Sequence, residues 1–195
     1  KNLNLPERVE SLGSRLIEKT AISSITIPKN VKYSTNVSSS YGVLVNVNTL
    51  KTVTFEEGME AIPSCIMASG SYTSYIDKII LPSQLKKIGS SAFYNCGKIT
   101  QMEVPKTITE IGGSAFENCT GLKSFRMNYN GTVEYKAEIG NAAFRGCTSL
   151  TDVSLSENVT SIGSMAFSGC TSLETLNLPE RVESLGRCLI EKTAI

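Results

Sequence analysis

The sequence predicts an α/β repeat solenoid dominated by β-structure, with a single domain over residues 1–195 and about eight repeats of ~23 residues. Two observations lead to this prediction. A nine-residue motif recurs four times at nearly constant spacing, and each copy is followed by apolar residues that alternate with polar ones. One such unit cannot bury its apolar side alone, so stacked units are expected to share one continuous core.

The recurring motif begins with Ile-Gly and ends with Cys. Its copies start at Ile88, Ile111, Ile139 and Ile162, at spacings of 23, 28 and 23 residues. In each copy, the segment Ala-Phe-x-x-Cys predicts a short helical turn that places the Phe and the Cys in the core. The expected core ladder contains Phe93, Phe116, Phe144, Phe167, Cys96, Cys119, Cys147 and Cys170.

Alternating apolar residues follow each motif, as in Leu150, Val153 and Leu155. A period of two residues predicts a half-buried strand, and a proline such as Pro105 is expected to end it. The strand positions are 3–5, 25–27, 53–55, 79–81, 102–104, 125–127, 153–155 and 176–178. The stack therefore predicts a parallel sheet on one face of the solenoid, with short strands, turns and helical turns on the other.

Glycine and asparagine mark the expected turns. A Gly follows the first residue of each motif, as in Gly112 and Gly140, which predicts a turn or a close approach of two backbones. The residue before each Cys is Asn or Gly, the types that best tolerate left-handed backbone, so a turn is expected there too. These residues are Asn95, Asn118, Gly146 and Gly169.

A longer repeat contains the short one. Residues 3–13 recur letter for letter at 176–186, and residues 16–22 recur at 189–195, with an offset of 173 residues. Packing would preserve residue types, but it would not preserve exposed charges such as Glu7 and Arg8. The near identity of residues 3–22 and 176–195 indicates a recent duplication. The chain is expected to be one 173-residue unit plus an overlap, taken from a longer protein.

The full pattern is Leu-x-x-Val-x-Leu-Pro-x-x-Val-x-x-Ile-Gly-x-x-Ala-Phe-x-x-Cys-x-x-Leu, and it resembles the BspA-like class of leucine-rich repeats. Residues 88–186 match closely apart from one five-residue insertion, and residues 3–87 match with slips. The resemblance implies a right-handed leucine-rich-repeat superhelix and secretion to a cell surface. It also implies adhesion to an extracellular protein or a glycan.

The cysteines are expected to be free thiols. Neighbours in a ladder would lie about one strand spacing apart, beyond the ~3.5–4.5 Å between Cβ atoms of a disulfide. Cys65 and Cys188 occupy another position and are expected to be partly exposed. No Cys-x-x-Cys pair suggests a zinc site, so neither a metal nor another cofactor is expected.

Composition argues against several functions. The chain has no His, the side chain best suited to acid–base catalysis near neutral pH, so an enzyme is not expected and no catalytic residue is assigned. The formal net charge of +1 and the lack of a basic run argue against nucleic-acid binding. No apolar stretch approaches the ~20 residues of a membrane span, and the isolated chain is expected to be monomeric.

Two surfaces are candidate binding sites. Irregular insertions carry Tyr33, Tyr41, Tyr72, Tyr75, Tyr129 and Tyr135, and tyrosine is favoured at recognition surfaces. The outward side of the predicted sheet carries Lys78, Ile80, Gln101, Glu103, Arg126 and Asp152. The alternative interpretations are that the tyrosines pack the loops and that the sheet face is merely solvated. We therefore expect a recognition or adhesion module, or else a structural spacer within a larger surface protein.

Overall fold

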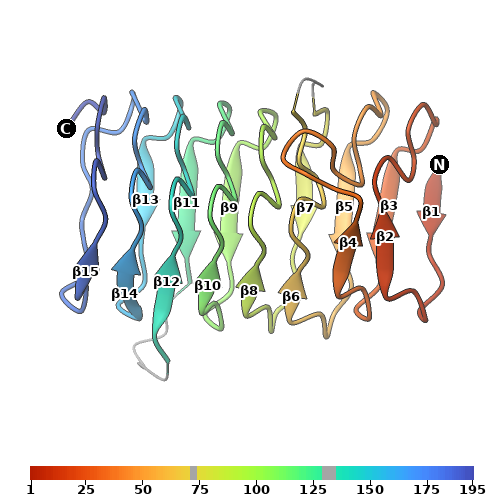
Figure 1. Ribbon diagram of the computed structural model, residues 1–195, viewed down its shortest axis with the longest axis horizontal. Helices are drawn as coiled ribbons and strands as arrows, with labels where there is room; N and C mark the ends of the chain where they lie inside the picture. The colour runs from red at the N-terminus through yellow and green to blue at the C-terminus, as the bar shows by residue number, and fades with distance from the viewer. Residues whose placement is uncertain (71–73, 129–134) are drawn as a thin grey trace.

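The computed structural model describes residues 1–70, 74–128 and 135–195. The chain winds into flattened coils that stack along one axis, with the two termini at opposite ends (Figure 1). Every pairing between the named strands is parallel. The predicted solenoid of parallel strands is therefore confirmed.

One side of the solenoid, which we call the long-strand face, carries one strand from most coils. Its strands are β1 (Asn2–Asn4), β3 (Ser24–Ile27), β5 (Thr52–Phe55), β7 (Lys78–Ile80), β9 (Gln101–Val104), β11 (Ser124–Met127) and β13 (Asp152–Ser154). Equivalent positions pair across coils, as in Ile25 with Val53 and Phe125 with Val153. The eighth predicted strand, 176–178, is not formed, because this segment makes no ladder with β13.

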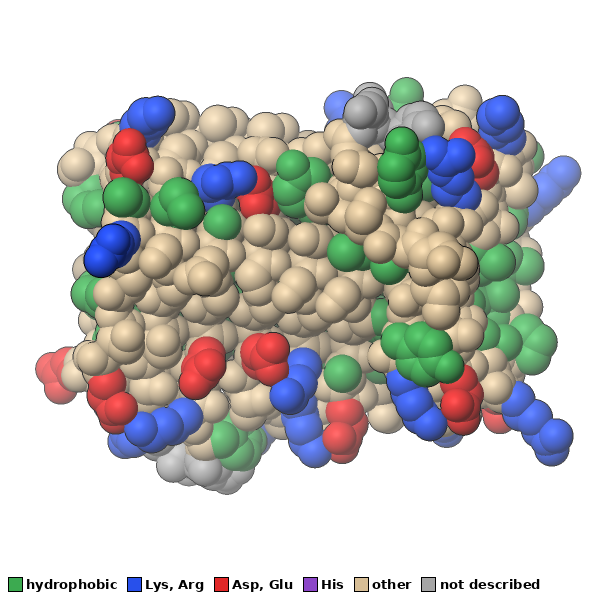
Figure 2. Space-filling view, in the orientation of Figure 1, with side chains coloured by type: hydrophobic (Ala, Val, Ile, Leu, Met, Phe, Trp, Pro, Cys, Tyr) green, Lys and Arg blue, Asp and Glu red, His purple; other side chains and the backbone are tan. Residues whose placement is uncertain are grey.

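The opposite side, which we call the short-strand face, carries the second strand of each coil. Its strands are β2 (Ser11–Gly13), β4 (Tyr33–Thr35), β6 (Ala61–Ile62), β8 (Lys87–Ile88), β10 (Glu110–Ile111), β12 (Ala137–Ile139), β14 (Val159–Ile162) and β15 (Ser184–Leu185). One sheet contains β6, β8, β10, β12, β14 and β15, and β2 pairs separately with β4. Figure 2 views the solenoid from the side of these strands and shows side chains of both charges along the upper and lower margins of the molecule.

The core lies between the two faces and is filled by ladders of identical residues. Phe116, Phe144 and Phe167 are fully buried, and their rings stack at centroid distances of 5.3 and 5.2 Å. Phe93 extends the stack at 5.0 Å from Phe116. Because each ring covers the next, neighbouring coils are joined by apolar contact as well as by backbone hydrogen bonds.

A third side, the turn face, comprises residues 89–96, 112–119, 140–147 and 163–170 of the regular coils. The prediction of helical turns there was wrong, because the described residues contain no helix. Each segment instead forms successive four-residue β-turns, such as those closed by Ala92 N to Gly89 O at 3.2 Å and Cys96 N to Phe93 O at 3.1 Å. Ser91 and Asn95 have φ of 53° and 60°. A left-handed residue every fourth position fits repeated type II turns and stops a helix.

The left-handed residues direct alternate amides of the turn face toward the next coil. In the coil of Phe93, the amides of Ser91, Phe93 and Asn95 donate to the carbonyls of Gly113, Ala115 and Glu117 at 2.8–2.9 Å. The predicted turn at the residue before each Cys is therefore present: Asn118, Gly146 and Gly169 also have φ of 58°, 72° and 75°. The turn face is thus a third ladder between the coils.

The glycines that follow the first motif residue lie where two coils approach closely. A Cβ at Gly112 would lie 2.6 Å from the backbone nitrogen of Ser90, and one at Gly163 would lie 2.5 Å from that of Asn141. Real Cβ atoms do not approach backbone so closely, so only glycine fits. In the parts of the chain that the structure describes, no helix has the length and hydropathy to cross a membrane.

Candidate binding groove

The long-strand face is interrupted between β7 and β9. Strands β1, β3, β5 and β7 form one sheet and β9, β11 and β13 another. Among the described residues, no backbone hydrogen bond joins β7 to β9. The same two coils remain paired elsewhere, through Ile88 with Ile111 on the short-strand face and Phe93 N to Ala115 O at 2.8 Å on the turn face. The coils therefore splay apart on one side only.

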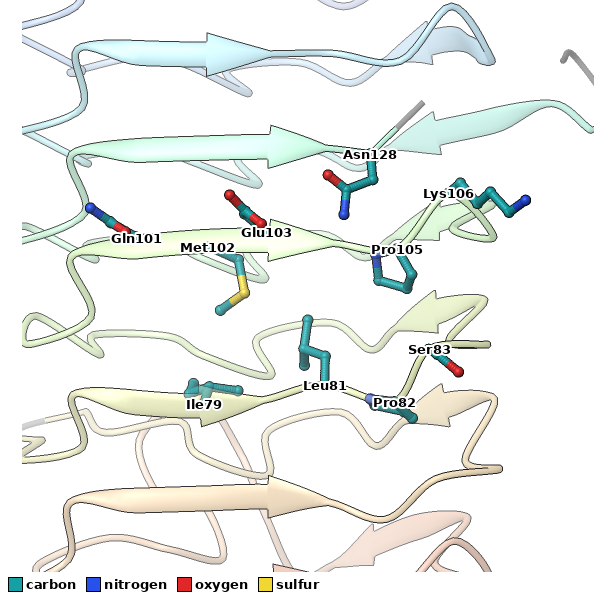
Figure 3. A pocket seen from close by; sticks show the side chains of 10 residues that line it. All are labelled: Ile79, Leu81, Pro82, Ser83, Gln101, Met102, Glu103, Pro105, Lys106 and Asn128. Atoms are coloured by element: carbon teal, nitrogen blue, oxygen red, sulfur yellow. The ribbon is translucent and has the colours of Figure 1, made fainter. Parts of the chain in front are cut away.

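The opening between β7 and β9 is a groove of about 590 Å³. Its lining residues are Ile79, Leu81, Pro82, Ser83, Gln101, Met102, Glu103, Pro105, Lys106 and Asn128. Figure 3 shows Leu81 and Met102 directed from the two strands into the space between them. The volume lies within the range of ~300–1,000 Å³ that is typical of ligand sites.

One backbone hydrogen bond that closes the next strand pair cannot form at the groove. Asn128 N donates to Val104 O at 3.0 Å at the end of the next strand pair. Pro105 occupies the equivalent place one coil earlier and has no N–H, so it cannot donate the matching bond toward Leu81. Leu81 is only half-buried, whereas Phe55, its counterpart on β5, is 1% exposed even though Pro82 likewise has no N–H to donate toward it.

The groove combines an apolar floor with a rim of mixed charge. Ile79 and Leu81 are half-buried, and Met102 is 4% exposed. Glu103 and Lys106 are both exposed and bring one charge of each sign. This balance favours an apolar or mixed segment over a strongly charged ligand.

The structure brings only some of the predicted sheet-face residues to this groove. Gln101 and Glu103 line it. Arg126 and Asp152 lie farther along the face and form an ion pair of 2.5 Å, and the hydrogen bond that Arg126 donates to Asp152 raises the pKa of Arg126 above its ordinary value. The two remaining residues, Lys78 and Ile80, are exposed on β7, and Ile80 is 42% accessible.

The predicted tyrosines are not brought together. Tyr33 and Tyr41 are 51% and 46% exposed, and the Arg15 guanidinium lies 4.6 Å from the Tyr41 ring centroid. The Tyr75 ring faces the Lys51 ammonium at 5.5 Å. Tyr75 precedes β7 of the long-strand face, whereas Tyr135 precedes β12 of the short-strand face. Tyr72 and Tyr129 lie outside the described residues.

Sequence reasoning missed the groove itself. Ile79, Leu81 and Met102 fit the same alternating pattern as the residues of unbroken strands, so the pattern assigned them to the core. Pro105 could have indicated a missing hydrogen bond, but Pro28 and Pro82 follow strands that pair normally. No stronger signal is present in the sequence.

The cysteines are all unpaired, and four of them are buried in the core. The Cys119 and Cys147 thiols donate to the carbonyls of Phe93 and Phe116, each at 3.1 Å, and thus add a side-chain bond between coils. Burial raises the pKa of Cys96 and Cys170 to about 12. Cys65 is half-buried and Cys188 is exposed.

Thiol alkylation should separate these cysteines. A raised pKa keeps a thiol protonated and unreactive, so at about pH 8 iodoacetamide should label Cys188 first, Cys65 more slowly and the four buried thiols only after unfolding. Mass spectrometry of peptides from native and urea-unfolded protein measures this order. Rapid labelling of Cys147 in the native protein, or a disulfide-linked pair of peptides, would contradict it.

Within the described residues, no cluster of three or more His, Cys, Asp or Glu side chains could hold a metal ion.

The whole chain matches the family model described as the BspA type leucine rich repeat region, in six copies over residues 1–69, 36–137 and 137–195. No curated protein matches the chain. The comparison thus indicates a repeat family and no catalytic one.

Solved structures show the same fold. A leucine-rich repeat protein from Eubacterium ventriosum is similar over 100% of this chain and 65% of its own, with 20% identity and a TM-score of 0.50. The leucine rich repeat protein of T. pallidum is similar over 88% of this chain and 77% of its own, with 21% identity and a TM-score of 0.57. A leucine-rich repeat protein from Bacteroides ovatus is similar over 95% of this chain and 63% of its own, with 20% identity and a TM-score of 0.50. The chain spans less than two thirds of the Eubacterium and Bacteroides proteins.

Proposed function

This chain belongs to the BspA-type leucine-rich repeat family, and we propose that it is a non-enzymatic recognition module that binds an extended segment of a partner protein in the groove between β7 and β9. The interrupted sheet is the observation that supports this proposal. Two neighbouring strands leave their facing edges unpaired above a partly exposed apolar floor. Such edges bind extended chains, which supply the missing hydrogen bonds.

The lining chemistry favours a protein segment. Apolar side chains of the partner would cover Ile79 and Leu81, which lack the cover that buries their counterparts on β5. Glu103 and Lys106 would accept polar groups at the rim. None of the lining residues is aromatic, so the groove has no flat platform on which a sugar ring could stack. We propose a location at the cell surface with this function, because the family resemblance implies it.

The alternative function is a structural spacer, and the 173-residue duplication is consistent with a spacer as well as with a recognition module. A peptide-display library selected against the protein distinguishes the two. Peptides that bind in the groove should lose about tenfold or more in affinity for the variants Leu81→Lys and Ser83→Arg. Thr54→Arg, on β5 of the same face, is the matched control and should change affinity by less than about twofold.

Two variants are used because Leu81 is half-buried and its replacement can disturb folding, whereas Ser83 is exposed at the rim. Thermal unfolding of each variant checks that the solenoid remains intact. A spacer should select no peptide above background. Peptides that bind all three variants equally would show that recognition, where present, lies outside the groove, and would contradict the proposal.

A further inference from the structure

The two ends of the solenoid are built from nearly the same sequence. We call residues 1–22 the N-terminal coil and residues 174–195 the C-terminal coil; from residues 3 and 176 onward they differ only where Ser14 and Arg15 correspond to Arg187 and Cys188. The N-terminal coil is followed by residues 23–50, which pack on it. No later coil covers the C-terminal coil in this structure (Figure 1). The same sequence is therefore seen both covered and uncovered.

Exposure shows what the covering segment does. Leu12 and Ile17 of the N-terminal coil are 3% and 2% exposed. Their counterparts in the C-terminal coil, Leu185 and Ile190, are 51% and 39% exposed. The C-terminal coil thus presents the apolar side chains that residues 23–50 bury at the other end.

Hydrogen bonds between the N-terminal coil and residues 23–50 are specific. Arg15 N donates to Gly42 O at 3.0 Å and Lys19 N to Asn46 O at 3.4 Å. The equivalent amides, those of Cys188 and Lys192, donate to no backbone acceptor among the described residues. Their backbone already has the left-handed conformation of the amides that make these bonds in the N-terminal coil. The φ values are 54° and 58° at Cys188 and Lys192, and 56° at both Arg15 and Lys19.

We propose that the uncovered side of the C-terminal coil binds a further copy of residues 23–50, carried by a second 173-residue unit in the same polypeptide. In that arrangement the C-terminal coil of one unit takes the place of the N-terminal coil of the next. Successive units then form one uninterrupted solenoid. At each joint the strands pair in the registers seen between the N-terminal coil and residues 23–50.

A unit in the same polypeptide fits better than a second molecule. In a separate molecule, residues 23–50 are already covered by that molecule's own N-terminal coil. Docking would first have to displace that coil, which makes the same contacts. A tandem copy meets no such competitor, because the duplicated coil is shared between the two units.

The test compares the 195-residue chain with a tandem chain in which a copy of residues 23–195 directly follows Ile195. Hydrogen exchange followed by NMR reads the amides of Cys188 and Lys192 in the first unit. Both should exchange at least ~100-fold more slowly in the tandem chain, since stable burial of a hydrogen bond protects an amide. The amide of Phe93, paired in both chains, is the internal reference.

Leu185→Glu in the first unit provides the matched control. In the 195-residue chain this residue is half exposed, so the substitution should be tolerated. In the tandem chain it would place a charge in the joint, and the protection of Cys188 and Lys192 should be lost while the Phe93 amide stays protected. That combination supports the proposal even where overall stability changes.

Two results would overturn the proposal. Unchanged exchange at Cys188 and Lys192, with the amides of the second unit protected, would show that the units fold as separate bodies. Protection of the same amides that rises with concentration in the 195-residue chain would show that another molecule occupies the surface. Neither result depends on whether the β7–β9 groove binds a partner.

Discussion

Replacement of Phe144 by alanine should lower the free energy of unfolding by about 3–5 kcal/mol, the range measured for buried aromatic residues. The ring is 0% exposed and contacts three others, with centroid distances of 5.3 Å to Phe116, 5.2 Å to Phe167 and 4.6 Å to Phe125. Alanine would leave a cavity that the ladder cannot close, because each coil is fixed by backbone bonds on three sides.

Urea denaturation followed by circular dichroism measures the effect of Phe144→Ala. Phe144→Leu is the matched control: it retains most of the volume and should cost no more than about 1.5 kcal/mol. A loss below about 1 kcal/mol for Phe144→Ala would mean that the coils around the ring can collapse into the space. The stacked ladder would then not be the main contact between coils.

Replacement of Gly140 by alanine should destabilise the protein by about 1–3 kcal/mol, or more, through overpacking. A Cβ at this position would lie 2.5 Å from Gly113 N and 2.8 Å from Gly112 C. Both contacts are backbone, which cannot rotate away as a flexible side chain can. The two coils would have to separate, which would weaken the ladder of the short-strand face beside β10 and β12.

Gly113 provides the control for Gly140, since it lies in the adjoining coil and has room for a Cβ. The nearest atom to a Cβ there is Asn141 O at 3.4 Å, an ordinary contact. Alanine restricts the unfolded chain, so Gly113→Ala should be neutral or stabilising by up to about 1 kcal/mol. Thermal denaturation of both variants compares them. Equal losses would show that the close approach of the coils is not what requires glycine.

Much of the fold could be predicted because it depends on local patterns. The alternation in Leu150, Val153 and Leu155 indicated a strand, and Asn95 indicated left-handed backbone; both features require only the residues beside them. The helical turn around Phe93 was predicted wrongly, because the alternative hydrogen bonds of these amides come from the next coil. The sequence of one coil does not show that competition.

The groove could not be predicted for a related reason. Ile79 and Met102 have the spacing of paired strand residues, and whether their strands meet depends on how two coils tilt against each other. The predicted sheet-face residues Gln101 and Glu103 lie at the groove because they alternate with Met102 on β9. Their place on the strand followed from the pattern, whereas the cavity beside them did not.

The hydrogen bonds of the turn face also have a direction. The amides of Cys65, Phe93, Phe116 and Phe144 all donate toward the coil that follows them. Their peptide dipoles therefore align along the axis of the stack, as those of a helix align along its own axis. Along the turn face these dipoles add from coil to coil, whereas amides of the two strand faces, such as those of Gly112 and Lys123, donate toward the preceding coil. The turn face therefore has a polarity along the axis of the stack that the two strand faces lack.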